Sequence, residues 1–214
     1  MPYTFNSWKE RLAQRSDLSP SLVHLTRSAI VDGNQLSPVD VLIKILLEKK
    51  IIGSDPRQAF IHGDRRAVCF QDAPLYSIAQ NILFEKKYKK EKPESRDRYS
   101  GCGLIFSKWY VHSRGGRPVI YDSPESATAY LDRDEWWRIV ALDLSDSANT
   151  VDWMHEREWR VKGDLEFELS RTAILIDTKA SYREFISKCR NIAEPNILES
   201  ICGIIVLSGL LDLT

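Results

Sequence analysis

Hydrophobic residues recur at helical spacing between residues 38 and 50, where they would form one apolar face of a helix. Ser37 is suited to cap the start of this helix, Pro38 occupies its first position, and Asp40 lies three residues after the cap. The apolar positions with this spacing are Val39, Leu42, Ile43, Leu46 and Leu47. The pattern predicts a helix that begins at Pro38.

Three other segments are predicted to contain helices: 4–15, 71–88 and 181–193. In the second of these, Asp72 is placed to cap the helix ahead of the Ala73-Pro74 break. The strongly charged stretch 86–101 follows, and its composition predicts a solvated loop.

Short runs rich in β-branched and aromatic residues, separated by Gly, Pro, Ser and Asp, predict strands. They are SLVHLTR (21–27), AVCF (67–70), GLIFS (103–107), RPVIYD (117–122), WRIVALDL (137–144), EWRVKG (158–163), TAILIDT (172–178) and, as a strand or buried segment, ICGIIVLSGLL (201–211). Residues 31–37 are predicted to be a loop, and Gly115-Gly116 a hairpin turn. We expect an α+β fold: a mainly antiparallel sheet with helices packed around it, in a single domain over 1–214 with residues 1–20 as a helical appendage.

Charge is balanced over the whole chain, so any attraction to nucleic acid must come from a local patch. The 214 residues include 30 Lys and Arg and 30 Asp and Glu, and 43% are hydrophobic. Seven Lys and Arg lie between Lys86 and Arg98, which makes this run a candidate for phosphate contact as well as a candidate loop. The candidate contacts with nucleic acid or another acceptor are Lys89, Lys90, Arg114 and Arg117.

The chain has no apolar run of about 18 to 20 residues that could span a bilayer, and no signal-peptide core near Met1. A cytoplasmic protein is therefore expected. The four cysteines and four histidines are widely scattered and lack metal-ligand spacing, so we expect reduced thiols and no metal site.

The stretch HEREWRVKG (155–163) is the main candidate for chemistry. Interpreted as a strand, it places Glu156, Glu158 and Arg160 on one face, with the two carboxylates about 7 Å apart. Two such carboxylates can perform acid–base chemistry or stabilise an oxocarbenium ion. Alternatively, they are neutralised by Arg160 on the same face and by Arg157 across strands. The spacing leaves both interpretations open.

His24 and Thr26 share one face of the strand predicted at 21–27. An imidazole and a hydroxyl that point into a cleft can bind ribose hydroxyls or an amide. A histidine that bonds to the backbone at a sheet edge is the alternative.

Several segments together resemble a family of bacterial abortive-infection proteins of the AbiGi type, which are associated with phage defence. They are HLT, VCFQDAPL, YSGCGLIFSKWYVHSRGGRPVIY and EREWRVKG, and the resemblance covers residues 22–162. The chain departs from the family pattern at Gln71-Asp72, where the family has Thr-Glu, and at YSGCG (99–103). The resemblance implies a role in a phage-defence or toxin–antitoxin system, with a cognate toxin or antitoxin as a partner.

The order of these motifs is also similar, more distantly, to DarT-type ADP-ribosyltransferases, which implies an ADP-ribosyltransferase-like fold with NAD as substrate. By this resemblance Glu158 would stabilise the ribosyl cation, and Glu156 would orient the acceptor, a nucleic acid or a protein. The residues that would contact NAD are His24, Thr26, Arg27, Tyr110 and Tyr121, the tyrosines by stacking on nicotinamide.

Two other functions fit the sequence. One is a non-catalytic module of the same fold, an antitoxin or sensor that binds a nucleotide or partner and leaves its carboxylates paired with Arg160 and Arg157. The other is a metal-dependent nuclease that would draw on Asp152 and Asp164.

Overall fold

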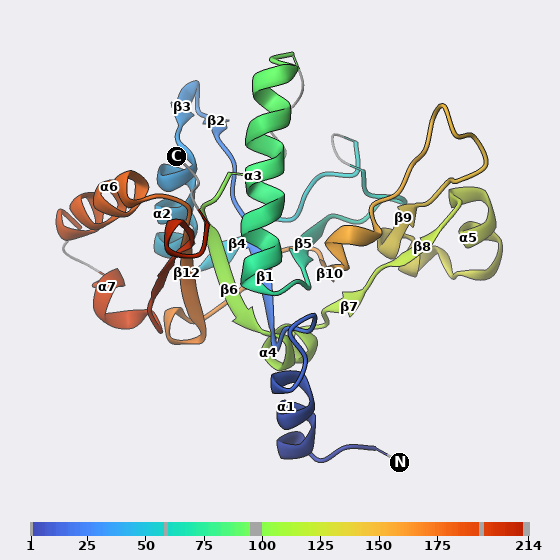
Figure 1. Cartoon of the computed structure of the whole chain (residues 1–214), viewed down its shortest axis with the longest axis horizontal. Coiled ribbons are helices and arrows are strands. Elements are labelled where there is room, and N and C mark those ends of the chain that lie inside the picture. The colour runs from blue at the N-terminus through green and yellow to red at the C-terminus, as the bar shows by residue number, and fades with distance from the viewer. Residues whose placement is uncertain (1, 58–59, 95–99, 193–194, 212–214) are drawn as a thin grey trace. The chain divides into compact units, whose positions relative to one another are not determined.

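The computed structural model describes residues 2–57, 60–94, 100–192 and 195–211 (Figure 1). The fold is α+β with mostly antiparallel strands, which confirms the predicted class. The chain forms two compact units, each built from separate segments. The first unit comprises Met1–Lys49, Ala73–Ser107 and Phe167–Thr214, and the second comprises Lys50–Asp72 and Lys108–Glu166.

Four strands of the first unit lie side by side in the order β13-β12-β6-β1. Antiparallel pairing joins β1 to β6 and β6 to β12, whereas β12 and β13 are parallel. A separate antiparallel hairpin, β2–β3, occupies part of the segment predicted to be a loop. The strands are β1 (Ser21–Leu25), β2 (Ala29–Val31), β3 (Asn34–Leu36), β6 (Gly103–Ser107), β12 (Thr172–Ile176) and β13 (Ile204–Val206).

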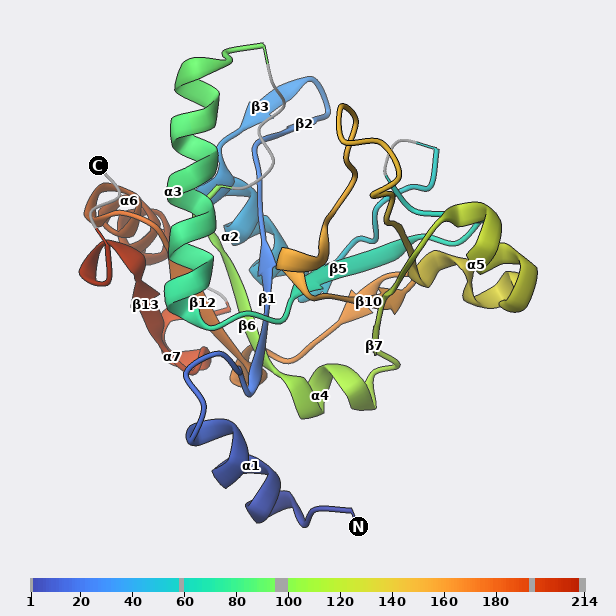
Figure 2. The same ribbon diagram turned by 45° about the vertical axis from the view of Figure 1, so that its right-hand side comes forward.

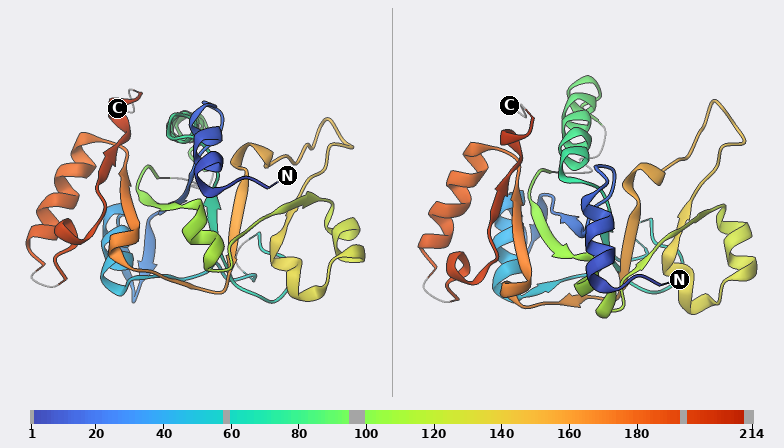
Figure 3. Two further views of the ribbon diagram at one scale, coloured as in Figure 1. Left: turned by 90° about the horizontal axis from the view of Figure 1, so that it is seen from below. Right: turned by 60° about the horizontal axis from the view of Figure 1, so that its bottom comes forward.

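Helices flank these strands, and α6 lies beside α2 in both views of Figure 3. They are α1 (Phe5–Ala13), α2 (Pro38–Glu48), α3 (Leu75–Glu91), α6 (Lys179–Arg190) and α7 (Ile197–Ser200), with short 3₁₀ turns η3 (Leu169–Arg171) and η4 (Leu207–Gly209). The buried residues Ile78 and Ile82 of α3 pack against Val23, Ile105 and Leu175. The helix α1 buries none of its residues.

The predicted start of α2 is confirmed. The Ser37 hydroxyl accepts the Asp40 backbone N–H, and the Asp40 carboxylate accepts the Ser37 N–H, with Pro38 at the first position. The Nζ atom of Lys188 on α6 lies 2.7 Å from Asp40 Oδ1 and holds the two helices together. The pKa of Asp40 is lowered, mainly by this hydrogen bond from Lys188.

The second unit is centred on β10, which is antiparallel to β5 on one side and β7 on the other (Figure 2). Two further pairs complete its strands: β4 with β11, antiparallel, and β8 with β9, parallel. The strands are β4 (Lys50–Ile51), β5 (Ala67–Gln71), β7 (Arg117–Pro118), β8 (Ile120–Asp122), β9 (Ile139–Ala141), β10 (Glu158–Lys162) and β11 (Leu165–Glu166). The helical elements are α4 (Lys108–Ser113), α5 (Pro124–Tyr130), η1 (Arg133–Arg138) and η2 (Met154–Glu156).

Three further local predictions were wrong. The helix α3 continues to Glu91, so the first part of the charged stretch is helical, while residues 95–99 lie outside the described residues. Asp72 does not cap α3, because Pro74 holds the cap position and Asp72 pairs with Lys108 instead. The Gly115-Gly116 turn ends α4 and does not join two strands of a hairpin.

This turn requires a backbone conformation that glycine adopts without steric cost, because Gly115 has a φ of +87°. Its N–H donates to the carbonyl of His112, and the N–H of Gly116 donates to that of Val111 at 2.8 Å. These bonds satisfy carbonyls at the end of a helix. None of the described helices is both long and apolar enough to cross a membrane.

Candidate functional site

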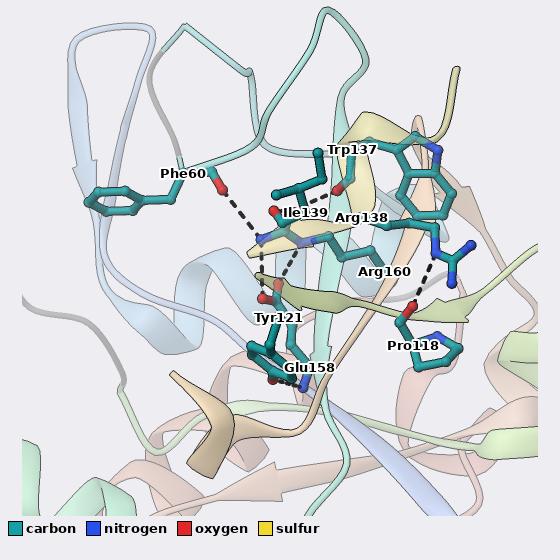
Figure 4. A network of polar contacts seen from close by, with 8 residues as sticks. All are labelled: Phe60, Pro118, Tyr121, Trp137, Arg138, Ile139, Glu158 and Arg160. Carbon is teal, nitrogen blue, oxygen red and sulfur yellow. Dashed lines mark hydrogen bonds and ion pairs between the residues drawn. The ribbon is translucent and has the colours of Figure 1, made fainter. Parts of the chain in front are cut away.

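Glu158 and Arg160 form a buried ion pair on one face of β10 (Figure 4). Because side chains alternate along a strand, these two residues point the same way. The Nε atom of Arg160 donates to Glu158 Oε1 at 2.8 Å, and Nη2 donates to Oε2 at 3.1 Å. Glu158 is 8% exposed and Arg160 is 3% exposed. The pairing is therefore bidentate and shielded from solvent.

Backbone carbonyls hold the rest of the Arg160 guanidinium (Figure 4). Its Nη1 donates to the carbonyls of Trp137 and Ile139 at 2.7 and 3.1 Å, and Nη2 donates to that of Phe60 at 3.3 Å. Burial by itself lowers the pKa of Arg160, but the adjacent Glu158 carboxylate outweighs it, so the pKa is raised above its ordinary value. The guanidinium therefore stays charged, and its hydrogen bonds fix it in place.

The expectation that Glu156 and Glu158 share a strand face was wrong. The strand β10 begins at Glu158, and Glu156 lies in the 3₁₀ turn η2. Between them, Arg157 adopts a left-handed backbone with φ of +44°, which interrupts the alternation of side chains. The Nε atom of Arg157 donates to the carbonyl of Asp72 at 2.7 Å. The two carboxylates therefore do not form a matched pair on one strand.

Gln71 lies opposite Glu158 in the antiparallel pair β5–β10, so both side chains are on the same face. It is 5% exposed, and neither its Nε2 nor its Oε1 has a hydrogen-bond partner among the described residues. Cys69 lies opposite Arg160 on the same face. Burial, together with the Glu158 carboxylate, raises the pKa of the Cys69 thiol well above its ordinary value, so the sulfur stays protonated.

Tyr121 of β8 brings a hydroxyl group to the same cluster (Figure 4). Its oxygen accepts the backbone N–H of Glu158 at 2.8 Å. Burial raises the pKa of Tyr121 to about 12, so the hydroxyl keeps its proton. No acceptor for that proton is found among the described residues. We call Gln71, Tyr121, Glu158 and Arg160 the β10 polar cluster.

A second charged contact of this unit involves Asp72, the residue that follows β5. Lys108 Nζ lies 2.8 Å from Asp72 Oδ2 and 5.9 Å from the centre of the Trp159 ring. The other carboxylate oxygen, Oδ1, is buried and has no partner within the described chain. Lys108 and the Arg157 guanidinium thus fix both the side chain and the carbonyl of Asp72.

The candidates His24, Thr26 and Arg27 belong to the first unit. His24 is partly buried in β1, and Arg27 is exposed. Thr26 is 3% exposed, and its hydroxyl lies 3.0 Å from the carbonyl of Cys102 and 3.2 Å from that of Pro38. The hydroxyl of Thr26 therefore connects segments of its own unit.

The remaining candidates lie on α3 and α4, in the turn after α4 and at the start of β7. Tyr110 is half-buried on α4, and the exposed Arg114 guanidinium lies 5.2 Å from the centre of its ring. Arg117 donates to the carbonyls of Gly116 and His112 at 2.7 and 3.3 Å. Lys89 and Lys90 lie near the end of α3. Among the predicted site residues, Glu158 and Tyr121 come from separate strands and are hydrogen-bonded, and the backbone N–H of Arg114 donates to the carbonyl of Tyr110 at the end of α4.

Sequence reasoning did not include Gln71 among the site residues. The available signal was a polar Gln-Asp pair directly after the apolar run AVCF, at the end of a predicted strand. Polar residues in that position are either caps or members of a site, and the sequence favoured the cap.

Comparisons of the chain with protein-family models, with curated proteins and with solved structures found no match. Within the described residues there is no group of three or more His, Cys, Asp and Glu side chains arranged to hold a metal ion.

Proposed function

We propose that this protein is a non-catalytic, nucleotide- or partner-binding module of a bacterial phage-defence system, an antitoxin or sensor of the AbiGi-like type. The observation that carries the proposal is the state of Glu158. Both of its carboxylate oxygens accept an N–H from Arg160, and the pair is buried. A carboxylate neutralised in this way contributes little net negative charge to a developing ribosyl cation.

Freeing Glu158 for catalysis would be costly. Breaking a buried ion pair by removing one partner costs about 3–5 kcal/mol, because the other charge remains uncompensated. Arg160 is also held by three carbonyl oxygens, so it cannot swing away without losing those bonds as well. The geometry therefore favours a structural role for the Glu158 carboxylate.

An NAD-dependent ADP-ribosyltransferase is the second candidate, with Glu158 as the residue that stabilises the ribosyl cation. Each carboxylate oxygen accepts one hydrogen bond from Arg160 and retains capacity for another, for example from a ribose hydroxyl. The unpartnered Gln71 side chain on the same face also favours a ligand at this position.

Nicotinamide release from NAD separates the two candidates. Purified protein is incubated with NAD, with and without DNA, RNA or cell extract, beside Glu158→Gln and Glu166→Gln. Glu166 is an exposed glutamate on β11 and provides the matched control. We expect no release from any protein, because Glu158 is engaged by Arg160. Release by the wild type and Glu166→Gln but not by Glu158→Gln would establish the transferase and reject the proposal.

Nucleic acid is the partner that the surface of α3 favours. The Phe84 and Tyr88 rings stack at 6.1 Å, Phe84 is 63% exposed, and Lys92 Nζ lies 5.1 Å from the centre of the Tyr88 ring. Lys87 and Lys90 are exposed on the same helix. Aromatic rings interleaved with cations are suited to unpaired bases and their phosphates.

A further inference from the structure

The carboxamide of Gln71 is buried and carries two unused hydrogen-bonding atoms. Exchanging its oxygen and nitrogen by a 180° flip leaves both atoms without a partner, so this does not depend on how the amide is oriented. Buried polar groups in folded proteins are almost always hydrogen-bonded, and an exception requires an explanation. A donor and an acceptor left open side by side can be satisfied by an ordered water or by a ligand that supplies the complementary pair.

Among the described residues, no neighbouring group is hydrogen-bonded to the Gln71 carboxamide. All three guanidinium nitrogens of Arg160 donate to Glu158 or to backbone carbonyls, and the Glu158 oxygens accept from Arg160. The Tyr121 oxygen accepts the Glu158 N–H and still has its own proton to donate. Gln71 thus offers a donor and an acceptor, Tyr121 a donor, and Glu158 a remaining acceptor.

The charge of the cluster restricts what can bind. Glu158 and Arg160 cancel each other, and the other charges that act on Cys69 and Tyr121 are the carboxylates Glu156 and Asp152. A phosphate or carboxylate buried here would have no free cation to pair with. A neutral planar group fits better, since a glutamine side chain pairs in bidentate fashion with an adjacent donor and acceptor such as N6 and N7 of adenine.

We propose that the β10 polar cluster binds a neutral planar group that presents a hydrogen-bond donor beside an acceptor, with Gln71 as the residue that recognises it. A primary carboxamide, such as that of nicotinamide, and the edge of an adenine base share this chemistry. Tyr121 is half-buried, whereas Gln71, Glu158 and Arg160 are buried. The inference rests on the proposed ligand-binding function and names the class of ligand for it.

The test is calorimetric titration of the whole protein with nicotinamide, adenosine and inorganic phosphate. The variants are Gln71→Leu and Gln71→Met, with Gln80→Leu, an exposed glutamine of α3, as the matched control. We expect the wild type and Gln80→Leu to bind nicotinamide or adenosine but not phosphate. Both Gln71 variants should bind at least about tenfold more weakly, because they lose a bidentate contact.

Thermal unfolding of the unliganded proteins distinguishes recognition from a structural role. Because replacement by an apolar side chain removes an unpaired buried group, the melting temperature of Gln71→Leu should equal or exceed that of the wild type. A structural glutamine would show the reverse, a lower melting temperature with unchanged affinity. The second variant, Gln71→Met, covers the case in which the branched leucine does not fit.

Each outcome of the titrations either supports or overturns the inference. Binding of nicotinamide alone assigns the site to a carboxamide, and binding of adenosine alone assigns it to adenine. Failure of the wild type to bind either compound at millimolar concentration overturns the inference, as does equal binding by the Gln71 and Gln80 variants. Turnover of NAD would reject the proposed non-catalytic function but would not affect the result that ligand affinity depends on Gln71. A failure of the proposed function can therefore be distinguished from a failure of this inference.

Discussion

The guanidinium of Arg160 is a permanent charge in a buried part of its unit, and this dictates how its surroundings must be arranged. One carboxylate balances the charge, and three carbonyls accept the remaining hydrogen bonds. Removing either partner leaves the other as an uncompensated buried charge. The two residues therefore contribute to the stability of the fold as a pair.

A double-mutant cycle measures how much the Glu158–Arg160 ion pair contributes to the free energy of unfolding. Arg160→Met should lower the free energy of unfolding by about 3–5 kcal/mol, since it strands the Glu158 carboxylate. The double variant Glu158→Gln/Arg160→Met should lose less than Arg160→Met alone, because no charge is then left unpaired. Urea unfolding followed by circular dichroism provides the measurement.

The matched control lies on the same strand. Lys162 pairs with Asp134 at 2.6 Å, but both side chains are largely exposed. Lys162→Met should therefore cost at most about 1 kcal/mol. Equal losses for Lys162→Met and Arg160→Met would contradict a special role for the buried pair.

At the scale of elements, α3 combines two surfaces. Ile78, Ala79 and Ile82 belong to the core of the first unit, whereas Phe84, Lys87 and Lys90 are exposed. The exposed part is the proposed contact for single-stranded nucleic acid. Its affinity should fall with salt, since each neutralised phosphate releases a counterion.

Substitution of Lys87 and Lys90 by glutamine should reduce the slope of log K against log salt by about 1.4, at about 0.7 for each phosphate contact of a single strand. Phe84→Ala should weaken binding by about 1–3 kcal/mol through lost stacking. Fluorescence anisotropy with a labelled oligonucleotide at several salt concentrations gives both values. The control is Lys9→Gln/Arg11→Gln, which removes two cations from α1. A slope that changes equally in both double variants would rule out α3 as the specific contact.

The elements also differ in how far the sequence could predict them. The start of α2 followed from Ser37, Pro38 and Asp40, because capping depends on neighbours within four residues. The start of β10 did not, because Arg157 adopts its left-handed backbone next to a contact with Asp72, 85 positions away in the chain. A non-glycine residue in that conformation costs of order 1–3 kcal/mol, and local sequence gives no sign of what stabilises it.

In the candidate site, too, contacts between neighbours in the sequence could be predicted and contacts between distant segments could not. The pairing of Glu158 with Arg160 could be foreseen as one of two alternatives, since the two residues alternate on a strand. The hydroxyl of Tyr121 and the carboxamide of Gln71 reach the cluster from other strands, and which strands become neighbours is decided by tertiary packing.

At the scale of the whole molecule, acid should weaken the fold in two steps. Burial, followed by the positive charge of Arg160, lowers the pKa of His62, while Glu125 opposes the shift. In the unfolded chain the histidine titrates near its usual pKa of about 6.5, so the unfolded state binds more protons below that pH. The free energy of unfolding should therefore fall as pH drops below about 6.5.

A second loss is expected below about pH 4. Hydrogen bonds from lysines lower the pKa of Asp40 and of Asp134, so these carboxylates stabilise the fold above the unfolded pKa and lose that contribution as they are protonated. Urea unfolding at pH 7.5, 5.5 and 3.5 resolves both steps. His62→Asn should remove the upper step, and His155→Asn, at an exposed position of η2, serves as the control. Identical pH profiles for wild type and His62→Asn would refute the assignment.

The interleaved segments of the two units impose an order on folding during translation. The second unit has all of its residues once Glu166 has left the ribosome, whereas the first still lacks β12 and β13. Until β12 has emerged as well, β6 has an unpaired edge where β12 will later bind. Four of the five residues of β6 are buried in the finished protein. An exposed apolar edge strand promotes association between chains. A nascent chain that stalls in this interval would thus expose an aggregation-prone strand edge, and we expect its need for chaperones to rise there.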